Sequence, residues 1–265
     1  ITAIIVILLL KIIKKKILTI HDLIHEKYKE TYKEKNFQLR KKIIDSMDAI
    51  ICVSNSTKNN LIEEYKVPNS KIKVIYHGGD HFNEVTEDKN SYKFLNKPFL
   101  LYVGSRKKYK NFSILLNVFK HSKKIYNDFN IVCFGTEKIN QNEISLFSLK
   151  NKIFFVNGDD SLLKKLYLNS VALICTSNDE GFCLPILEAM SLGCPVIGPN
   201  LDSLKEVYKD NIFYFERNNL ESLIFAMENN LYSKNSTIDK TTTALKYSKN
   251  FTWKKNSSQT LEYYS

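Results

Sequence analysis

Residues 175–200, CTSNDEGFCLPILEAMSLGCPVIGPN, are the stretch of sequence that decides the fold. Apolar runs at 171–174 and 195–198 flank a glycine-containing loop and a helical pattern. This order predicts a strand, a loop, a helix and a second strand, which is the repeating unit of a parallel sheet. Gly181 permits a tight turn in the loop, and Pro185 fits the first turn of the helix. The stretch therefore predicts an α/β protein.

Two carboxylates lie on either side of the start of this helix. Glu180 belongs to the loop and Glu188 to the helix that we expect over 185–192. Backbone N–H groups of 181–186 should point out of the helix N-terminus at the carboxyl end of the sheet, where open α/β sheets bind ligands and the helix dipole favours phosphate. Both carboxylates could face that crevice. Alternatively, Glu180 is a solvated loop charge and Glu188 interacts with the dipole of its own helix.

A basic turn follows another apolar run. In LYVGSRKKYKNF, residues 101–112, Gly104 opens a turn that contains Arg106 and three lysines, among them Lys110. An arginine fork with an ammonium nearby is suited to hold a diphosphate without a metal. An ordinary basic surface turn is the alternative that the local pattern leaves open.

The same alternation of short apolar runs and helical patterns continues over most of the chain, as in βαβ units. Strands are expected at 17–20, 49–53, 72–76, 99–103, 130–134, 153–156, 171–174, 195–198 and 212–215. Besides 185–192, helices are expected at 111–126, 140–150 and 160–169. The segment 78–98 is polar, begins with glycine and lacks a helical or strand period, which predicts a linker.

The linker divides the chain into two unequal parts. The pattern after it is that of a complete doubly wound domain, expected over 97–250. Three strands before it are too few for such a domain, so we expect 1–96 to be a partial N-terminal domain plus the linker. The apolar run 1–10 is shorter than the roughly 18 to 20 residues of a membrane span. We interpret it as an inner helix or strand of a chain whose start is missing, with a truncated membrane anchor as the alternative.

Composition excludes several classes of protein. The chain has 265 residues, 43% hydrophobic and 25% charged, which is typical of a folded protein. Its net charge of +11 is accompanied by no helix-turn-helix, zinc or aromatic-basic motif, so we expect no nucleic-acid partner. The five cysteines form no C-x-x-C pair, and no histidine lies at zinc-ligand spacing. We therefore expect reduced thiols, no disulfide and no metal site.

Taken in order, these segments resemble the retaining glycosyltransferases of the GT-B fold, specifically the GT4 family (glycosyl transferases group 1). EGFCLPILEAMSLGCPVIGPNLDSLKEV resembles the E-x7-E stretch of that family, and LLYVGSRKKYKNFSILLNVF its donor-diphosphate strand and turn. TIHDLIHEKY, DAIICVSNSTKNNLIE and KVIYHGGD resemble segments of its N-terminal domain. FTWKKNSSQTLEYY resembles the closing helix, so 251–265 is expected to cross back onto the first domain. The resemblance implies two Rossmann-like domains, the N-terminal one incomplete.

Roles for five side chains follow from the resemblance. It implies that Glu180 contacts hydroxyls of the donor sugar and that Glu188 holds the ribose of the nucleotide. Arg106 and Lys110 would neutralise the departing diphosphate. His21 matches the histidine that reaches the donor sugar from the first domain, although a histidine at a strand end can also be structural. We interpret three other histidines as structural or linker residues: His25, His77 and His81.

The resemblance also implies a backbone site for the donor phosphates. Gly104 and the segment formed by Gly181, Phe182, Cys183 and Leu184 would lie against them. The family usually has glycine where this chain has Cys183, and its Cβ narrows the approach of backbone to phosphate. We expect this difference to tune the choice of donor.

The function implied is transfer of a sugar, such as mannose, from a nucleotide-sugar donor to a growing surface polysaccharide, for example an O-antigen, or to a lipid-linked acceptor. GDP-mannose or a UDP-sugar would be the donor substrate, with no cofactor. A truncated, inactive member that still binds nucleotide sugar is the alternative. A cytoplasmic location is expected. The first domain could also contact an anionic membrane, or its basic residues could simply be solvated. Those basic residues are Lys11, Lys14, Lys15, Lys16, Lys27, Lys29, Lys33, Lys35, Arg40, Lys41 and Lys42.

Overall fold

The structure is a computed structural model that describes residues 15–28, 35–106, 108–135, 149 and 151–264. The apolar run 1–10 and nearly all of the helix expected over 140–150 lie outside the described residues.

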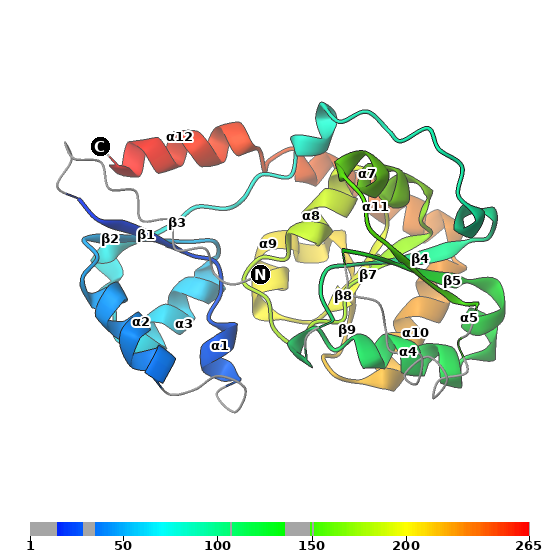
Figure 1. Cartoon of the computed structure of the whole chain (residues 1–265), viewed down its shortest axis with the longest axis horizontal. Coiled ribbons are helices and arrows are strands. Elements are labelled where there is room, and N and C mark those ends of the chain that lie inside the picture. The colour runs from blue at the N-terminus through cyan, green and yellow to red at the C-terminus, as the bar shows by residue number, and fades with distance from the viewer. Residues whose placement is uncertain (1–14, 29–34, 107, 136–148, 150, 265) are drawn as a thin grey trace.

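A small parallel sheet forms the first part of the chain (Figure 1). Its strands β1 (Ile17–Ile20), β2 (Ala49–Cys52) and β3 (Ile72–Val74) are arranged in that order. Helices α1 (Ile24–Lys27), α2 (Lys35–Asp45) and α3 (Asn55–Tyr65) connect them. The central strand β2 is buried along its whole length, as expected for an apolar strand paired on both edges.

A six-stranded parallel sheet forms the second part, with the order β6-β5-β4-β7-β8-β9. Counted from β4, this is the 3-2-1-4-5-6 order of the doubly wound fold, with the strand order reversing between β4 and β7. The α/β fold class predicted from the sequence is confirmed. The strands are β4 (Phe99–Val103), β5 (Asn130–Phe134), β6 (Ile153–Val156), β7 (Ala172–Ile174), β8 (Val196–Pro199) and β9 (Phe213–Phe215).

Helices cover both faces of this sheet and complete two apolar cores (Figure 1). Alternate residues of β4 enter opposite cores, since Leu101 packs with the side of α7 and α8 and Leu100 with the side of α4 and α10. The helices are α4 (Phe112–His121), α5 (Lys123–Asp128), α7 (Asp160–Asn169), α8 (Leu184–Ser191), α9 (Asp202–Tyr208), α10 (Leu220–Leu231) and α11 (Lys234–Ser248). The sheet is therefore buried on both sides, which explains its continuous apolar strands.

The single helix predicted over 111–126 is two helices, α4 and α5, and that prediction was wrong in this respect. Ser122 separates them with a non-helical backbone, at φ −104° and ψ 102°. Its hydroxyl accepts a hydrogen bond from the backbone N–H of Ile125 at 3.3 Å and caps the second helix. A serine that satisfies a helix N-terminus in this way interrupts a pattern that otherwise looks continuous.

The segment 78–98 contains two short 3-10 turns, His81–Asn83 and Lys93–Asn96, and lies along α7. Lys164 and Lys165 of α7 donate hydrogen bonds to backbone carbonyls of this segment, at 2.6 to 2.9 Å. Phe82 is buried and packs edge-on against Tyr167. The connection between the two sheets is thus held on the second one.

The last helix, α12 (Trp253–Tyr264), lies across the face of the small sheet opposite α2 and α3 (Figure 1). The hydroxyl of Tyr263 donates a hydrogen bond to the carbonyl of Lys71 at 2.9 Å, and the amide of Asn256 donates to the carbonyl of Tyr76 at 2.8 Å. Within the part of the chain that the structure describes, no helix has both the length and the apolar character that crossing a membrane requires.

Two polar contacts hold α3 and α1 to the second sheet. The carboxylate of Glu206 accepts hydrogen bonds from the backbone N–H groups of Asn55 and Ser56, at 2.6 and 2.8 Å. This caps the N-terminus of α3 from the other part of the chain, where the helix dipole favours a negative charge. Lys27 forms an ion pair with Asp179 at 2.8 Å. These contacts bring the carboxyl ends of both sheets face to face.

Candidate functional site

A largely buried ion pair lies where the strand order of the large sheet reverses. Lys110 follows β4 and Glu180 follows β7, and their Nζ and Oε1 atoms are 2.5 Å apart. The hydroxyl of Ser177 donates to the same carboxylate oxygen at 2.6 Å. Burial acts to lower the pKa of Lys110, but the charge of Glu180, the nearby Cys183 and Cys175 and the hydrogen bond to Glu180 together hold this pKa well above its ordinary value. Lys110 is therefore a fixed cation at the crevice where this fold binds ligands.

The two loops that carry this ion pair are tied together by the backbone. The hydroxyl of Thr176 donates to the carbonyl of Lys110 at 2.8 Å, and the backbone N–H of Asn178 donates to the carbonyl of Tyr109 at 2.6 Å. A cavity of about 20 Å³ opens between them, with Lys110 and Glu180 among its lining residues. This is room for one water-sized group.

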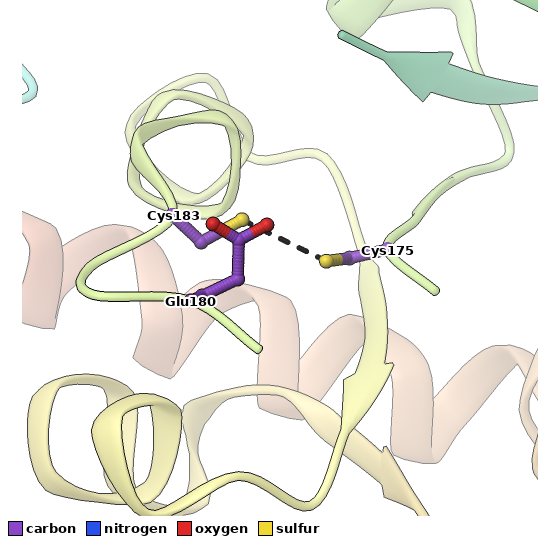
Figure 2. Close-up of side chains that lie close together, drawn as sticks. All are labelled: Cys175, Glu180 and Cys183. Atoms are coloured by element: carbon purple, nitrogen blue, oxygen red, sulfur yellow. Dashed lines mark hydrogen bonds between the residues drawn. The ribbon is translucent and has the colours of Figure 1, made fainter. Parts of the chain in front are cut away.

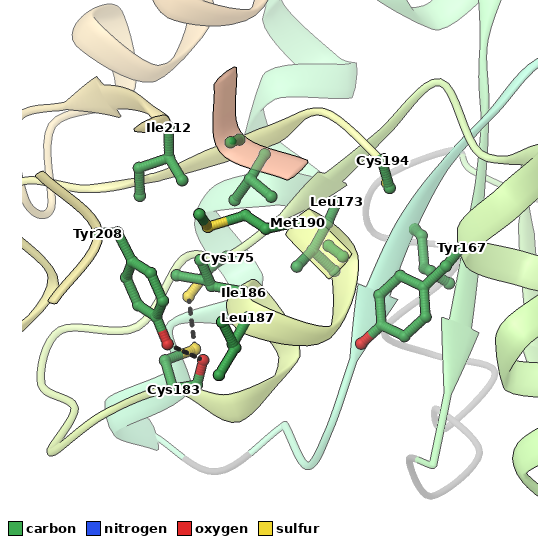
Figure 3. Packing of buried hydrophobic residues seen from close by; sticks show 14 of the residues in the cluster. Tyr167, Leu173, Cys175, Cys183, Ile186, Leu187, Met190, Cys194, Tyr208 and Ile212 are labelled. Atoms are coloured by element: carbon green, nitrogen blue, oxygen red, sulfur yellow. Dashed lines mark hydrogen bonds between the residues drawn. The ribbon is translucent and has the colours of Figure 1, made fainter. Parts of the chain in front are cut away.

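The start of α8 is fixed from two sides. The hydroxyl of Tyr208 donates to the carbonyl oxygen of Phe182 at 2.8 Å. It also lies in donating position to the carbonyl oxygen of Cys183, at 3.0 Å (Figure 3). Cys183 has a left-handed backbone, at φ 62°, immediately before Leu184 begins the helix. The N-terminal amides of α8 therefore emerge from a rigid turn, and their partial positive charge faces the crevice.

Glu188 lies on α8 between two partners. Its Oε2 accepts a hydrogen bond from the hydroxyl of Tyr167 at 2.8 Å, and its Oε1 is 3.6 Å from Nε2 of His81. Burial raises the pKa of this carboxyl group, although the hydrogen bond from Tyr167 and the neighbouring His81 act to lower it. Sequence reasoning interpreted His81 as a linker residue and missed this contact, because nothing local to the segment indicates that it packs on α8.

Arg106 is placed differently from Lys110. Its guanidinium lies over the rings of Phe112 and Phe155, with 5.9 Å to each ring centre. The structure thus brings Lys110 to Glu180 and turns Arg106 toward α4 and β6. Gly104, which precedes it, has a φ of 114°, a backbone conformation that favours glycine at the end of β4. A role of either residue at a diphosphate stays a prediction.

His21 comes to this region from the first sheet and is paired with a second histidine. Nδ1 of His21 is 3.3 Å from Nε2 of His77, and the two rings are stacked with their centres 5.3 Å apart. The backbone carbonyl of His21 lies directly against Gly181. His77 also packs edge-on against Phe182. The sequence interpretation of His77 as merely structural missed the pair, since the two residues are joined by the sheet and not by spacing.

Protonation of this pair is unfavourable in the folded state. Burial, followed by the nearby His21, lowers the pKa of His77 from 6.5 to about 4. Burial also lowers the pKa of His21, while Asp22 acts to raise it. The Nδ1 atom of His77 is buried without a hydrogen-bond partner. A charge on this ring would have nothing to stabilise it there.

We expect acidification to destabilise the fold through His77. The unfolded chain binds a proton at this histidine near pH 6.5 and the folded chain near pH 4. The contribution to stability is therefore complete above pH 6.5 and is lost as the pH falls to about 4, by at most about 3 kcal/mol. Urea unfolding at pH 7, 5.5 and 4 measures it. His77→Phe should show a smaller loss between pH 7 and 4, and an equal loss in both proteins would contradict the assignment.

An open parallel sheet with this strand order, carrying a buried lysine–glutamate pair at its switch point, defines a Rossmann-like ligand-binding domain. The chain belongs to the glycosyl transferases group 1 family, whose model matches residues 84–241. A second family model, glycosyltransferase family 4, matches residues 1–81. The family resemblance inferred from the sequence is confirmed.

Two proteins similar to this chain are named as mannosyltransferases. The chain is 28% identical over 227 residues to the O-antigen chain mannosyltransferase RfbU of Salmonella typhimurium, covering 82% of this chain and 61% of that protein. It is 30% identical over 124 residues to the serotype-specific mannosyltransferase WbdA of Escherichia coli, covering 44% of this chain and 15% of that one. The chain thus spans about three fifths or less of the length of these relatives.

Solved structures agree on the fold. HepE of Anabaena in complex with UDP-glucose matches with a TM-score of 0.78 at 17% identity, over 93% of this chain and 71% of that one. A glycosyltransferase from Rickettsia africae matches with a TM-score of 0.66 at 25% identity, over 84% of this chain and 65% of that one. The GT-B type of fold predicted from the sequence is confirmed.

Proposed function

We propose that the protein is a retaining glycosyltransferase that moves a sugar, mannose first among the candidates, from a nucleotide-sugar donor to a growing surface polysaccharide or lipid-linked acceptor. The observation that carries the proposal is the buried cation of Lys110, held beside the N-terminus of α8 at the switch point of the sheet. Membership of the family and the names of the two mannosyltransferase relatives support it.

The chemistry of transfer needs charge stabilisation more than a nucleophile. A sugar nucleotide reacts by losing a nucleoside diphosphate from an oxocarbenium-like centre, so positive groups at the departing phosphate oxygens lower the barrier. Lys110 and the amides of α8 supply that charge, with Arg106 in reach if its guanidinium leaves the two phenylalanine rings. Retention follows if the acceptor hydroxyl attacks from the face of the leaving group and a phosphate oxygen takes its proton.

The two glutamates bind different parts of the donor in this proposal. Glu180 accepts hydrogen bonds from hydroxyls of the transferred sugar, while its neighbour Lys110 holds the phosphate. Glu188 accepts hydrogen bonds from the ribose hydroxyls of the nucleotide. Its orientation is already set by Tyr167, so little ordering remains to be done when the nucleotide binds. His21 approaches the sugar from the first sheet.

Contact with an anionic membrane on its cytoplasmic face is a further part of the proposal, and the structure narrows the basic residues available for it. Lys27 is paired with Asp179, and Arg40 with the buried Glu26 at 2.6 Å. Lys42 is exposed on α2, whereas the exposed Lys41 is paired with Asp45 at 3.2 Å. Binding to anionic but not neutral vesicles, weakening with added salt, is the behaviour that supports this contact.

Donor binding and transfer test the proposal together. We expect GDP-mannose or a UDP-sugar to raise the unfolding temperature and to yield a glycosylated acceptor by mass spectrometry. Because protein cations hold the phosphates, EDTA should leave the rate unchanged. Glu188→Gln should weaken nucleoside diphosphate binding by about 10-fold, the size of a hydrogen bond to a charged group. The exposed Glu221→Gln is the matched control.

Three results would count against this function. If EDTA abolishes activity and Mg²⁺ restores it, a metal ion and not the protein's cations stabilises the leaving diphosphate. Nucleotide binding without transfer to any acceptor would favour an inactive nucleotide-sugar-binding protein. An unchanged nucleotide affinity in Glu188→Gln would contradict the ribose contact.

A further inference from the structure

Two cysteines from different elements meet beneath the proposed donor site (Figure 2). Cys175 follows β7 and Cys183 precedes α8, and each residue is buried, with 8% of its surface exposed. We propose that Cys175 and Cys183 form a dithiol that hydrogen peroxide oxidises to a disulfide, and that this disulfide closes the donor site. The formation of the bond is independent of the proposed function, whereas the closing of the site rests on it.

The geometry is close to that of a bond. The two Sγ atoms are 3.6 Å apart and hydrogen-bonded to each other. A disulfide needs an S–S distance of about 2.05 Å, so an approach of about 1.5 Å joins them. Seven residues separate the two cysteines in the sequence, so a search for C-x-x-C pairs does not find them. The expectation of no disulfide concerned local spacing, and the loop brings these two thiols together without it.

The two thiols differ in their readiness to lose a proton. The hydrogen bond between the two sulfurs, in which either thiol could be the donor, lowers the pKa of Cys175, burial and the charge of Glu180 act to raise it, and the Lys110 ammonium acts to lower it. The same hydrogen bond, together with burial, raises the pKa of Cys183. In the proposal Cys175, which follows the strand and lies beside the Lys110 cation, is the thiolate that attacks, and Cys183 is the thiol that resolves the product.

A metal ion is the competing use of these atoms. One carboxylate oxygen of Glu180 and the two sulfurs lie within 4.8 Å of one another, a donor set that a thiophilic cation could take. However, Lys110 and Ser177 both contact Oε1 of Glu180. A divalent cation would lie close to the Lys110 ammonium, which repels it. That ammonium favours an anion at this place, either a thiolate or a phosphate.

Oxidation balances with one molecule of peroxide. The Cys175 thiolate attacks a peroxide oxygen, the O–O bond breaks, and with one proton the products are a sulfenic acid and water. The Cys183 thiol then attacks that sulfur and displaces a second water, leaving the disulfide. Two thiols lose two electrons and the peroxide gains them. The cavity of about 20 Å³ that both cysteines line has room for a reagent near the size of water.

The disulfide would change the donor site because it would constrain the loop between Cys175 and Cys183. It would enclose 176–182, the loop that carries Glu180 and Gly181. It would also pull on Cys183, which is fixed by a left-handed backbone and by the hydrogen bond from Tyr208 to its carbonyl. The N-terminus of α8 and the pair of Lys110 and Glu180 would both shift. Displacements of this size are enough to lose a preorganised phosphate site.

Mass spectrometry after peroxide treatment tests the bond directly. We expect the protein to lose 2 Da per chain, with a cross-linked peptide pair containing Cys175 and Cys183, and to regain that mass with dithiothreitol. Cys175→Ser should abolish the cross-link. Cys133→Ala, which removes a thiol buried in β5, should retain it and is the matched control. Calorimetry with GDP-mannose should show at least a 10-fold loss of affinity after oxidation, reversed by the reductant.

Each failure has its own signature. Oxidation that stops at a sulfinic acid, or that gives no cross-link, would overturn the dithiol. A tight equimolar complex with Zn²⁺ that requires both cysteines and blocks oxidation would replace it with a metal site. A disulfide that forms and leaves the donor affinity unchanged would overturn the closing of the site. A reduced protein that binds no nucleotide sugar would instead contradict the proposed function.

Discussion

Lys110→Ala is expected to slow sugar transfer by about 30- to 1000-fold, which corresponds to roughly 2 to 4 kcal/mol, the effect of removing one preorganised electrostatic donor. The side chain lies largely buried against Glu180, so the substitution removes the cation and leaves the carboxylate with the hydrogen bond from Ser177. No water can replace a fixed charge at equal strength in such a site. The loss should appear in kcat more than in KM, because the charge develops in the transition state.

Stability must be separated from catalysis in this variant. Removing one partner of a buried ion pair is destabilising by itself. Urea unfolding of Lys110→Ala, Glu180→Gln and the double variant gives the coupling between the pair, while transfer is measured under conditions where all are folded. Lys120→Ala, an exposed lysine on α4, is the control. Near-wild-type transfer by folded Lys110→Ala would refute its place at the leaving group.

Arg106 extends the same test. Its guanidinium lies over the rings of Phe112 and Phe155. If it turns to the diphosphate in the donor complex, Arg106→Ala should lose transfer by a factor similar to that of Lys110→Ala. A loss below about 3-fold would assign it to packing against those rings, where a cation–π contact contributes on the order of 1 kcal/mol to stability.

The strands of this protein could be predicted because each is a short apolar run between turn signals. Every strand expected within the described residues is present, with ends that agree or differ by one or two residues. Buried parallel strands leave this signal in the sequence, since both of their faces are covered. The break at Ser122 could not be predicted, because a helix pattern continues across it and only the hydrogen bond of its hydroxyl reveals the cap.

The candidate site was predictable only in part, and the reason is the order of the strands. Lys110 and Glu180 were each expected at a strand end, but their contact depends on β4 and β7 being neighbours, which no local pattern records. The pair of His21 with His77 was missed for the same reason, whereas the pair of Cys175 with Cys183 was missed because it depends on the course of the loop between them. Family resemblance indicates which single residues matter, while tertiary structure decides which residues meet.

Gly181→Ala is expected to have an effect as large as the loss of the cation, by a different route. A Cβ on Gly181 would lie 1.9 Å from the backbone oxygen of His21 and 3.0 Å from its carbonyl carbon. Real Cβ atoms do not approach backbone so closely, and backbone cannot rotate away as the end of a side chain can. The hydroxyl of Thr57, at 3.1 Å, closes the other side. The first sheet must therefore move away from the loop.

That movement separates the two sides of the site. His21 would be displaced from the donor sugar by about 1 Å or more, and misplacement on this scale is enough to cost roughly 100-fold in transfer. The overpacked contact should also lower the free energy of unfolding by about 1 to 3 kcal/mol. Nucleoside diphosphate binding should change less than transfer does, because Glu188 and Lys110 both belong to the second sheet and need not follow the first.

A second glycine-to-alanine variant distinguishes the general effect of replacing a glycine from the specific clash of Gly181→Ala with the first sheet. At Gly158 an added Cβ would meet the flexible end of Leu162, at 2.7 Å, and the position is exposed, so Gly158→Ala should be close to wild type. Transfer, nucleotide affinity and urea unfolding are measured on both variants. If Gly181→Ala transfers sugar at the wild-type rate, the two sheets need not approach as closely for catalysis as they do in this structure, and His21 then loses its place at the donor sugar. If nucleotide affinity falls as steeply as transfer, the substitution acts on the phosphate loop itself, because nucleotide binding depends on residues of the second sheet.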